Sequence, residues 1–212
     1  MRTSIKDYAR LLAATLPAAE PIYELGALQV EGQEGFADLR PLFPGKTYVG
    51  CDMRPGRGVD RILDLHRLDL GSDMVGTVLC FDTLEHVEYP HRAVEEMYRV
   101  LRPGGYLAIT SVMDFHIHDH PHDYWRFTPD AFRSLLRPFT QVRVDWAGRE
   151  IFPHTVVGIG VKGGTLDLGA YEKEVALWQR RWWNPKGRSW QTAIHQLTPP
   201  LLLDLYRKLK RA

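Results

Sequence analysis

Residues 75–105 read VGTVLCFDTLEHVEYPHRAVEEMYRVLRPGG, and this stretch decides the fold class. Val75–Phe81 is a nearly continuous apolar run, which is typical of a strand covered on both faces of a sheet. His91–Leu101 has apolar residues at helical spacing, and the turn PGG (103–105) leads into a further apolar run, Tyr106–Val112. A strand, a helix and a strand in this order form a right-handed crossover, so the stretch predicts a parallel α/β sheet.

The same alternation extends toward the N-terminus. Ser4–Leu16 has the apolar spacing of a helix, and Pro17 stops it. After this helix we expect a strand, a helix and two more strands, over Pro21–Leu25, Gly35–Leu42, Thr47–Cys51 and Arg61–Leu65.

Toward the C-terminus, Thr128 and Pro129 are typical of the N-cap and first residue of another helix. Two apolar runs follow, Gln141–Trp146 and Thr155–Val161. The loop between them is too short for a crossover helix, so we expect an antiparallel pair. One strand of the sheet is then reversed.

A chain of 212 residues fits one domain and a short appendage. We place the domain at residues 1–163 and a basic, Trp-rich helical extension at residues 164–212. The net charge of +1 argues against general nucleic-acid binding, although the segment from Tyr171 to Ala212 carries nine Lys/Arg against three Asp/Glu. This extension has four open roles: a helix packed on the core, a cap on the substrate pocket, a homodimer contact, or a weak contact with an anionic membrane surface.

The N-terminal residues lack the apolar core of a signal peptide, and no apolar run approaches the roughly 18 residues of a membrane span. Cys51 and Cys80 each lie at the end of an apolar run, which favours buried free thiols. We therefore expect a cytoplasmic protein.

Polar residues that follow the predicted strands mark the candidate site, because ligands of open α/β sheets bind at the carboxyl ends of the strands. Gly26 ends the first strand, but Leu28 occupies the second glycine position of a dinucleotide fingerprint. Asp52 ends the second strand, where a carboxylate can accept both hydroxyls of a ribose or simply form a turn. Asp64 follows and can accept a hydrogen bond from an adenine amino group.

Two sequence motifs carry a family resemblance. The run DTLEH (82–86) follows the fourth predicted strand, and the run RVLRPGG (99–105) precedes the fifth. With these motifs the chain resembles class I S-adenosylmethionine (SAM)-dependent methyltransferases of the methyltransferase 11/23 type, over about Ile22–Gly163. The resemblance implies a Rossmann-like sheet of seven strands in the order 3-2-1-4-5-7-6, one of them antiparallel, with helices on both faces and SAM as the cofactor.

The resemblance also implies the residues that bind the cofactor. Glu24 and Gly26 would line the methionine part of SAM, Asp52 would hold the ribose, and Met53 would pack on the adenine. The remaining contacts would come from Asp64 and Leu65 at the adenine edge and from Phe81 and Asp82, which would close the pocket. The departure at Leu28 and the segment 29–35 indicate a different loop near the methionine moiety.

Residues 114–129 read DFHIHDHPHDYWRFTP and resemble a subgroup with a His-x-x-Pro-x-Asp-Tyr-Trp-Arg-Phe-Thr-Pro stretch, often associated with bacterial glycan or natural-product gene sets. The segment follows the fifth strand and would overhang the methyl group. Three interpretations are open: one histidine is a general base, the His/Asp cluster binds a divalent metal, or the segment is a polar lid in which Arg126 pairs with a carboxylate.

Within this segment we predict that His118 is the general base and that Asp123 orients it or holds the acceptor. The predicted substrate contacts are His86, His116, Tyr124, Trp125 and Arg126, and no residue is assigned as a metal ligand. The sequence thus predicts methyl transfer from SAM to an O or N atom of a small polar molecule, a sugar or a natural-product intermediate. The alternatives are a catalytically silent SAM-binding module that serves as a partner protein and a metal-dependent hydrolase.

Overall fold

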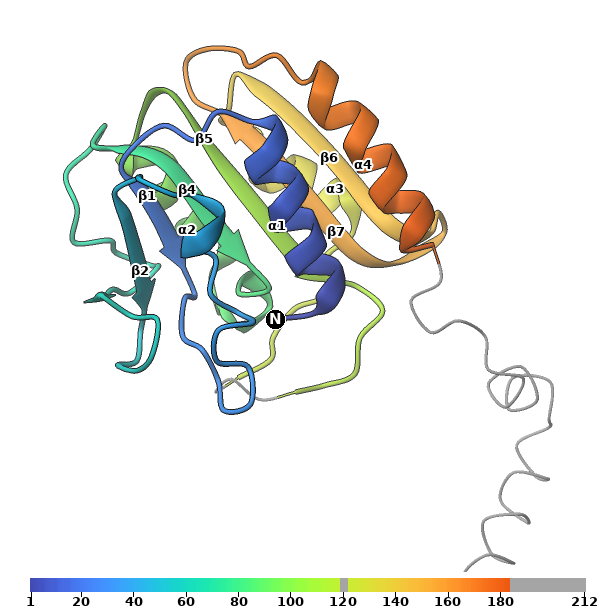
Figure 1. Ribbon diagram of the computed structural model, residues 1–212, viewed down its shortest axis with the longest axis horizontal. Coiled ribbons are helices and arrows are strands. Elements are labelled where there is room, and N and C mark those ends of the chain that lie inside the picture. Colours follow the sequence, from blue (N-terminus) through green and yellow to red (C-terminus); the bar gives the residue numbers. More distant parts are fainter. Residues whose placement is uncertain (119–121, 184–212) are drawn as a thin grey trace, which may run out of the picture.

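The computed structural model describes residues 1–118 and 122–183. Its core is one seven-stranded sheet in the order β3-β2-β1-β4-β5-β7-β6 (Figure 1). All neighbouring strands pair in parallel except for β7, which is antiparallel to both β5 and β6. The predicted strand order and the single reversed strand are confirmed. The strands are β1 (Ile22–Leu25), β2 (Tyr48–Asp52), β3 (Arg61–Ile62), β4 (Val75–Phe81), β5 (Leu101–Val112), β6 (Gln141–Arg149) and β7 (Phe152–Val161).

Helices cover both faces of the sheet, as predicted. The α-helices are α1 (Thr3–Thr15), α2 (Pro90–Val100), α3 (Pro129–Leu135) and α4 (Gly169–Arg181), and two short 3₁₀ helices are η1 (Arg40–Leu42) and η2 (Leu84–His86). The apolar residues of α1 and α4 belong to one core cluster, and those of α2 and α3 to another on the opposite face. Figure 1 shows α1 and α4 side by side on the near face of the sheet.

The apolar patterns in the sequence explain these elements. Every residue of β4 is buried, because the strand lies in the middle of the sheet with helices on both faces. The helix α3 begins as predicted, with Thr128 Oγ1 accepting a hydrogen bond from the backbone N–H of Ala131 at 3.1 Å. Cys51 and Cys80 are buried free thiols, also as predicted.

The predicted helix over Gly35–Leu42 is wrong, because only η1 forms there. Gly32 and Gly35 both adopt positive φ, at 79° and 75°, which a right-handed helix does not allow. The side chain of Gln29 accepts a hydrogen bond from the N–H of Gly35 at 3.0 Å and so ties the start of this segment to the loop after β1. The connection from β1 to β2 is therefore a loop.

The predicted third strand, Arg61–Leu65, shortens to β3. The chain turns back after Leu63, because the carboxylate of Asp64 accepts the backbone N–H of His66 at 2.8 Å, and Asp64 and Arg67 form an isolated antiparallel bridge. The helix predicted over His91–Leu101 shifts by one residue at each end.

The strands β5, β6 and β7 are longer than predicted. The predicted turn at residues 103–105 lies inside β5, where the register shifts between the pairs Val75–Leu101 and Thr77–Tyr106. The extra residues on β5 form a bulge, because β5 has more residues than β4 between these two pairs. β6 and β7 form one hairpin that turns at residues 150 and 151.

The helix α4 packs on α1, so residues near both ends of the described chain meet. The indole N–H of Trp178 donates to the carbonyl of Ser4 at 2.8 Å, and the hydroxyls of Tyr8 and Tyr171 lie 3.1 Å apart. Trp190 and the rest of the predicted extension after residue 183 lie outside the described residues. Among the described residues, no helix combines the length and the apolar character needed to cross a bilayer.

Candidate active site

A cavity of about 530 Å³ opens at the carboxyl ends of β1, β2 and β4. Its volume is in the range of small-molecule sites, and its position is the one expected for ligands of an open α/β sheet. Twelve of the predicted site residues line it: Glu24, Gly26, Asp52, Met53, Asp64, Leu65, Phe81, Asp82, His86, His116, His118 and Tyr124.

Gly26 lies where the tips of β1, β2 and β4 meet. The backbone N–H groups of Gly26 and Ala27 donate to the carbonyl of Cys51 at 2.8 and 2.9 Å. Gly26 has φ +91°, and a Cβ there would lie 2.0 Å from Oγ1 of Thr83. Only glycine fits, because both the backbone conformation and the contact with Thr83 exclude a side chain.

Glu24 is a buried carboxyl on the cavity wall. Its Oε2 accepts a hydrogen bond from the hydroxyl of Tyr48 at 2.7 Å. Burial raises the pKa of Glu24 to about 7, although the Tyr48 hydrogen bond and the charge of Arg40 oppose this rise. The carboxyl therefore changes its charge near neutral pH.

Asp52 and Met53 follow β2 and face the same cavity. Oδ1 of Asp52 accepts the backbone N–H of Arg54 at 3.0 Å, which is the turn-forming interaction that the sequence left open. This bond occupies one carboxylate oxygen, so the turn does not exclude a ligand on the other. Met53 is 63% exposed and offers an apolar surface beside it.

Asp64 is engaged by its neighbour His66. Its Oδ1 accepts from the backbone N–H of His66 at 2.8 Å and lies 2.9 Å from the ring Nδ1. The backbone hydrogen bond is the main reason why the pKa of Asp64 lies below its usual value. Asp64 and Leu65 both line the main cavity.

Asp82 forms a bidentate ion pair with Arg2, which the sequence analysis did not predict. Arg2 Nε donates to Oδ2 at 3.0 Å and Nη2 donates to Oδ1 at 2.8 Å. Burial alone would raise the pKa of Asp82, but the charge and hydrogen bonds of Arg2 hold it below its usual value. Arg2 also donates to Thr155 at 2.6 Å and lies over the ring of Phe115, so the N-terminal segment forms one wall of the cavity.

Glu85, in η2, is 1% exposed. Its Oε2 accepts a hydrogen bond from Ser111 Oγ at 2.7 Å, whereas the buried Oε1 has no hydrogen-bond partner among the described residues. Burial, followed by the nearby charge of Asp82, raises the pKa of Glu85 to about 8.

His118 lines the cavity, and Asp123 lies behind it. Asp123 Oδ2 accepts the backbone N–H of His118 at 2.9 Å and lies 3.1 Å from the ring Nδ1. Arg126 binds both oxygens of Asp123, and this hydrogen bonding is the main reason why the pKa of Asp123 lies far below its usual value. The Asp123 side chain is only 2% exposed and does not line the cavity, so its contacts are those with His118 and Arg126.

The predicted substrate contacts divide between two cavities. His86, His116 and Tyr124 line the main cavity, and the ring centroids of His86 and His118 are 4.7 Å apart. Trp125 and Arg126 line a separate cavity of about 650 Å³ between α2 and α3. The indole of Trp125 donates to the carbonyl of Val87 at 3.0 Å, which anchors this segment beside η2.

Comparison with known families gives one match. A family model described as "Methyltransferase domain" matches residues 39–109, from the residue before η1 to a point three residues before the end of β5. No protein with a curated description matches this chain in sequence.

Solved structures resemble this chain over a larger part of its length than the family model does. A SAM-dependent methyltransferase of Archaeoglobus fulgidus has a TM-score of 0.59 at 13% identity, covering 74% of this chain and 93% of that one. A SAM-dependent methyltransferase of Thermotoga maritima has a TM-score of 0.53 at 21% identity, covering 74% and 89%. The methyltransferase CalH, in complex with S-adenosylhomocysteine (SAH), has a TM-score of 0.55 at 17% identity, covering 74% and 58%.

These likenesses show that the chain has the fold of SAM-dependent methyltransferases. Together with the family match over residues 39–109, they support SAM as the cofactor.

Proposed function

We propose that this protein is a SAM-dependent methyltransferase that acts on an O or N atom of a small polar molecule, a sugar or a natural-product intermediate. One observation carries the proposal. Twelve residues that the sequence assigns to cofactor or acceptor come from segments spread along the chain and line a single cavity at the carboxyl ends of the strands.

In this proposal the cofactor lies between β1, β2 and β4. Asp52 binds the ribose hydroxyls, Met53 packs on the adenine, and Asp64 and Leu65 contact the adenine edge. Glu24 and Gly26 line the methionine moiety, with Phe81 and Asp82 closing the cavity below it. SAM supplies an electrophilic methyl group, so the protein contributes mainly alignment for an in-line displacement.

The acceptor lies against the loop that follows β5. Asp123 holds the Nδ1 side of the His118 ring, so the second nitrogen is the one that can meet the acceptor. In the metal-free protein this nitrogen takes the proton of a hydroxyl or ammonium acceptor. On the acceptor side, the main cavity is lined by His86, His116 and Tyr124. Trp125 and Arg126 line the second cavity and hold the loop from that side.

The test is calorimetric titration of the full chain with SAH, the demethylated product. We expect one SAH per chain, and Asp52→Ala should weaken binding by about 1–3 kcal/mol, the scale of hydrogen bonds to a charged group. The matched control is Asp130→Ala, an exposed carboxylate in the first turn of α3. Absence of SAH binding by the unmodified protein would contradict the proposal.

The runner-up is a SAM-binding module without transfer activity. It shares the cofactor site and differs only on the acceptor side, where it predicts that SAH binds but that changes at His118 have no kinetic effect. We also propose that the basic extension caps the pocket, joins a homodimer or contacts an anionic membrane surface. Sedimentation with anionic vesicles, released by rising salt, is the result expected of the membrane contact.

A further inference from the structure

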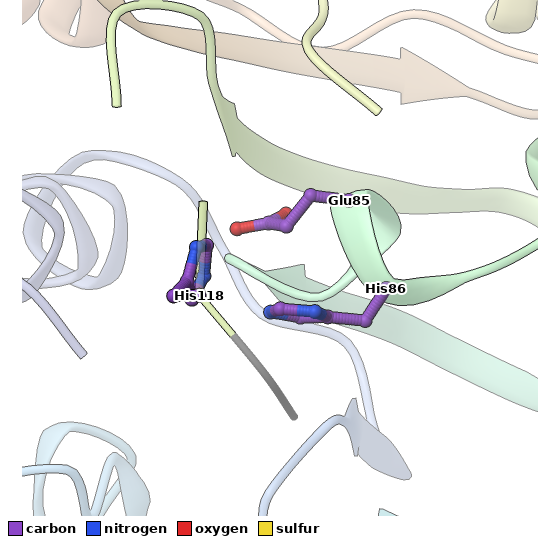
Figure 2. A group of neighbouring side chains, drawn as sticks. All are labelled: Glu85, His86 and His118. Atoms are coloured by element: carbon purple, nitrogen blue, oxygen red, sulfur yellow. The ribbon is translucent and has the colours of Figure 1, made fainter. Parts of the chain in front are cut away.

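We propose that Glu85, His86 and His118 bind one divalent transition-metal ion on the acceptor side of the cavity. Figure 2 shows the carboxylate of Glu85 and the ring of His86, both from η2, turned toward the ring of His118 in the loop after β5. Each side chain offers one ligand atom, and the three atoms all lie within 4.8 Å of one another.

The donor set selects the class of ion. Two imidazole nitrogens and one carboxylate oxygen suit zinc, manganese, iron, cobalt or nickel rather than calcium or magnesium, which prefer oxygen ligands. Bonds of about 2.1 Å in a tetrahedral site place ligand atoms about 3.4 Å apart. The three ligand atoms, which lie within 4.8 Å of one another, therefore need to approach by at most about 1.4 Å to bind an ion.

The hydrogen bonds of both rings match those of metal-binding histidines. Nδ1 of His86 bonds to the carbonyl of His122, and Nδ1 of His118 lies 3.1 Å from Asp123 Oδ2 and 3.2 Å from the carbonyl of His116. Because these oxygens only accept, Nδ1 carries the hydrogen in each neutral ring, which puts the lone pair on Nε2. Histidine ligands commonly donate their second N–H to a carbonyl or carboxylate in this way.

The carboxylate of Glu85 provides an independent observation. A buried carboxyl oxygen without a hydrogen-bond partner is costly, and Oε1 of Glu85 is such an atom among the described residues. Ser111 fixes the other oxygen, Oε2. A cation bound at Oε1 would give this atom the partner that it lacks.

The loop that carries His118 is tethered to Glu85. The backbone N–H groups of Tyr124 and Trp125 donate to the carbonyl of Glu85 at 2.8 and 3.2 Å. The Glu85 residue thus supplies both a ligand atom and the attachment point of the segment that follows the third ligand. These two hydrogen bonds hold the loop beside η2, and so they keep His118 close to Glu85 and His86.

Binding of an ion does not depend on the proposed function. The role of that ion in activating a methyl acceptor does rest on it. An ion at this site keeps coordination positions open to the cavity and lowers the pKa of a hydroxyl bound to it. The acceptor oxygen then releases its proton to water, attacks the methyl carbon, and the S–CH₃ bond breaks to leave SAH. The inferred substrate class is a small molecule with a metal-binding hydroxyl, and His118 is a ligand rather than a base.

The experiment uses the untagged full chain after metal removal. Zn²⁺ is titrated by calorimetry, and Co²⁺ by its visible absorption, which reports the ligand geometry. We expect one ion per chain. Glu85→Gln, His86→Gln and His118→Gln should each weaken binding more than about 100-fold, and Asp123→Asn about 10–100-fold as a residue that orients a ligand. The matched control His91→Gln, an exposed histidine of α2, should bind as the unmodified protein does.

Two results would overturn the inference: no ion bound by the stripped unmodified protein, or unchanged affinity and stoichiometry in the three ligand variants. SAH titration of the same samples separates this outcome from the proposed function. A chain that binds SAH but no ion keeps the methyltransferase proposal and loses the metal site. A chain that binds the ion but no SAH keeps the metal site and loses the methyltransferase proposal.

Discussion

At the scale of single residues, His118 combines the contacts that the acceptor chemistry requires. It lines the cavity, its backbone and ring are held by Asp123, and its ring lies against that of His86. If His118 is the base of the proposed function, His118→Ala should lower turnover by about 10²–10⁴-fold while SAH affinity is unchanged, because removal of a positioned base has this cost. The measurement is SAH release with an acceptor that the unmodified protein methylates.

His91→Ala is the control, since this exposed histidine of α2 lies outside the main cavity. A fall in turnover of less than about threefold, far below the range for a lost base, would assign His118 to the lid alone. Chelation separates the two active roles. If His118 acts as a base, the unmodified protein keeps its turnover in the presence of a chelator. If His118 is a metal ligand, the protein loses its turnover in chelator and regains it when the ion is returned.

The positions of the strand-end acids can be predicted from the sequence, but their partners cannot. Apolar runs mark where β2 and β4 end, so Asp52 and Asp82 fall at the ligand-binding edge of the sheet. Arg2 is 80 residues from Asp82 and carries no local pattern. Glu85 is a second example. The sequence places it in the run DTLEH (82–86), but it does not reveal that one of its oxygens, Oε1, lacks a hydrogen-bond partner among the described residues.

At the scale of elements, the tips of β1 and β4 depend on the contact between Gly26 and Thr83. We expect Gly26→Ala to destabilise the protein, because its Cβ would overlap Oγ1 of Thr83 and the residue would keep φ +91°. Adding Thr83→Ala removes the atoms at 2.0 and 2.9 Å but not the backbone strain. Urea unfolding should therefore show partial recovery in the double variant.

Thr83→Ala alone is the control for the loss of its own hydrogen bonds, to the carbonyls of Leu25 and Phe81. If Gly26→Ala alone is as stable as the unmodified protein, the close contact is not a constraint. If the double variant shows no recovery, backbone strain alone accounts for the loss.

The elements that the sequence predicts best are those with an unbroken apolar pattern. β4 and α2 are fixed by such patterns, and their bounds agree with the expected ones to within a residue. The segment Gly35–Leu42 has helical spacing too, but Gly32 and Gly35 act as turn residues and Gln29 captures a backbone N–H. Apolar spacing does not report such side-chain bonds, so a local turn replaces the predicted helix.

At the scale of the whole molecule, Glu24 contributes to the pH dependence of stability, and a Glu24 variant isolates its share. Its pKa is about 7 in the folded chain, against an ordinary value of 4.5. Between these values the folded state holds a proton that the unfolded state has lost, so the free energy of unfolding falls as pH rises through this window. We expect Glu24→Gln to remove this contribution, and its stability relative to the unmodified protein to rise by up to about 2.5 kcal/mol from pH 5 to pH 8.

Urea unfolding at pH 5 and pH 8 measures this difference, with Glu150→Gln in the exposed β6–β7 turn as the control. Tyr48, Arg40, Asp38 and Lys6 surround Glu24 in both proteins, so their own titration largely cancels. An equal stability difference between Glu24→Gln and the unmodified protein at the two pH values would show that Glu24 is ionised throughout.

The packing of α1 against α4 has a consequence for how the chain folds as it is synthesised. The hydrogen bond from Trp178 to Ser4 spans 174 residues, and Tyr8 meets Tyr171 across 163. The first helix leaves the ribosome with its apolar side exposed, and its partner emerges only after the whole sheet has been translated. Contacts of this sequence separation slow folding, since a long loop must close before they form. The helix α1 therefore keeps its apolar side exposed until α4 has been translated, although seven of its thirteen residues are buried in the finished protein.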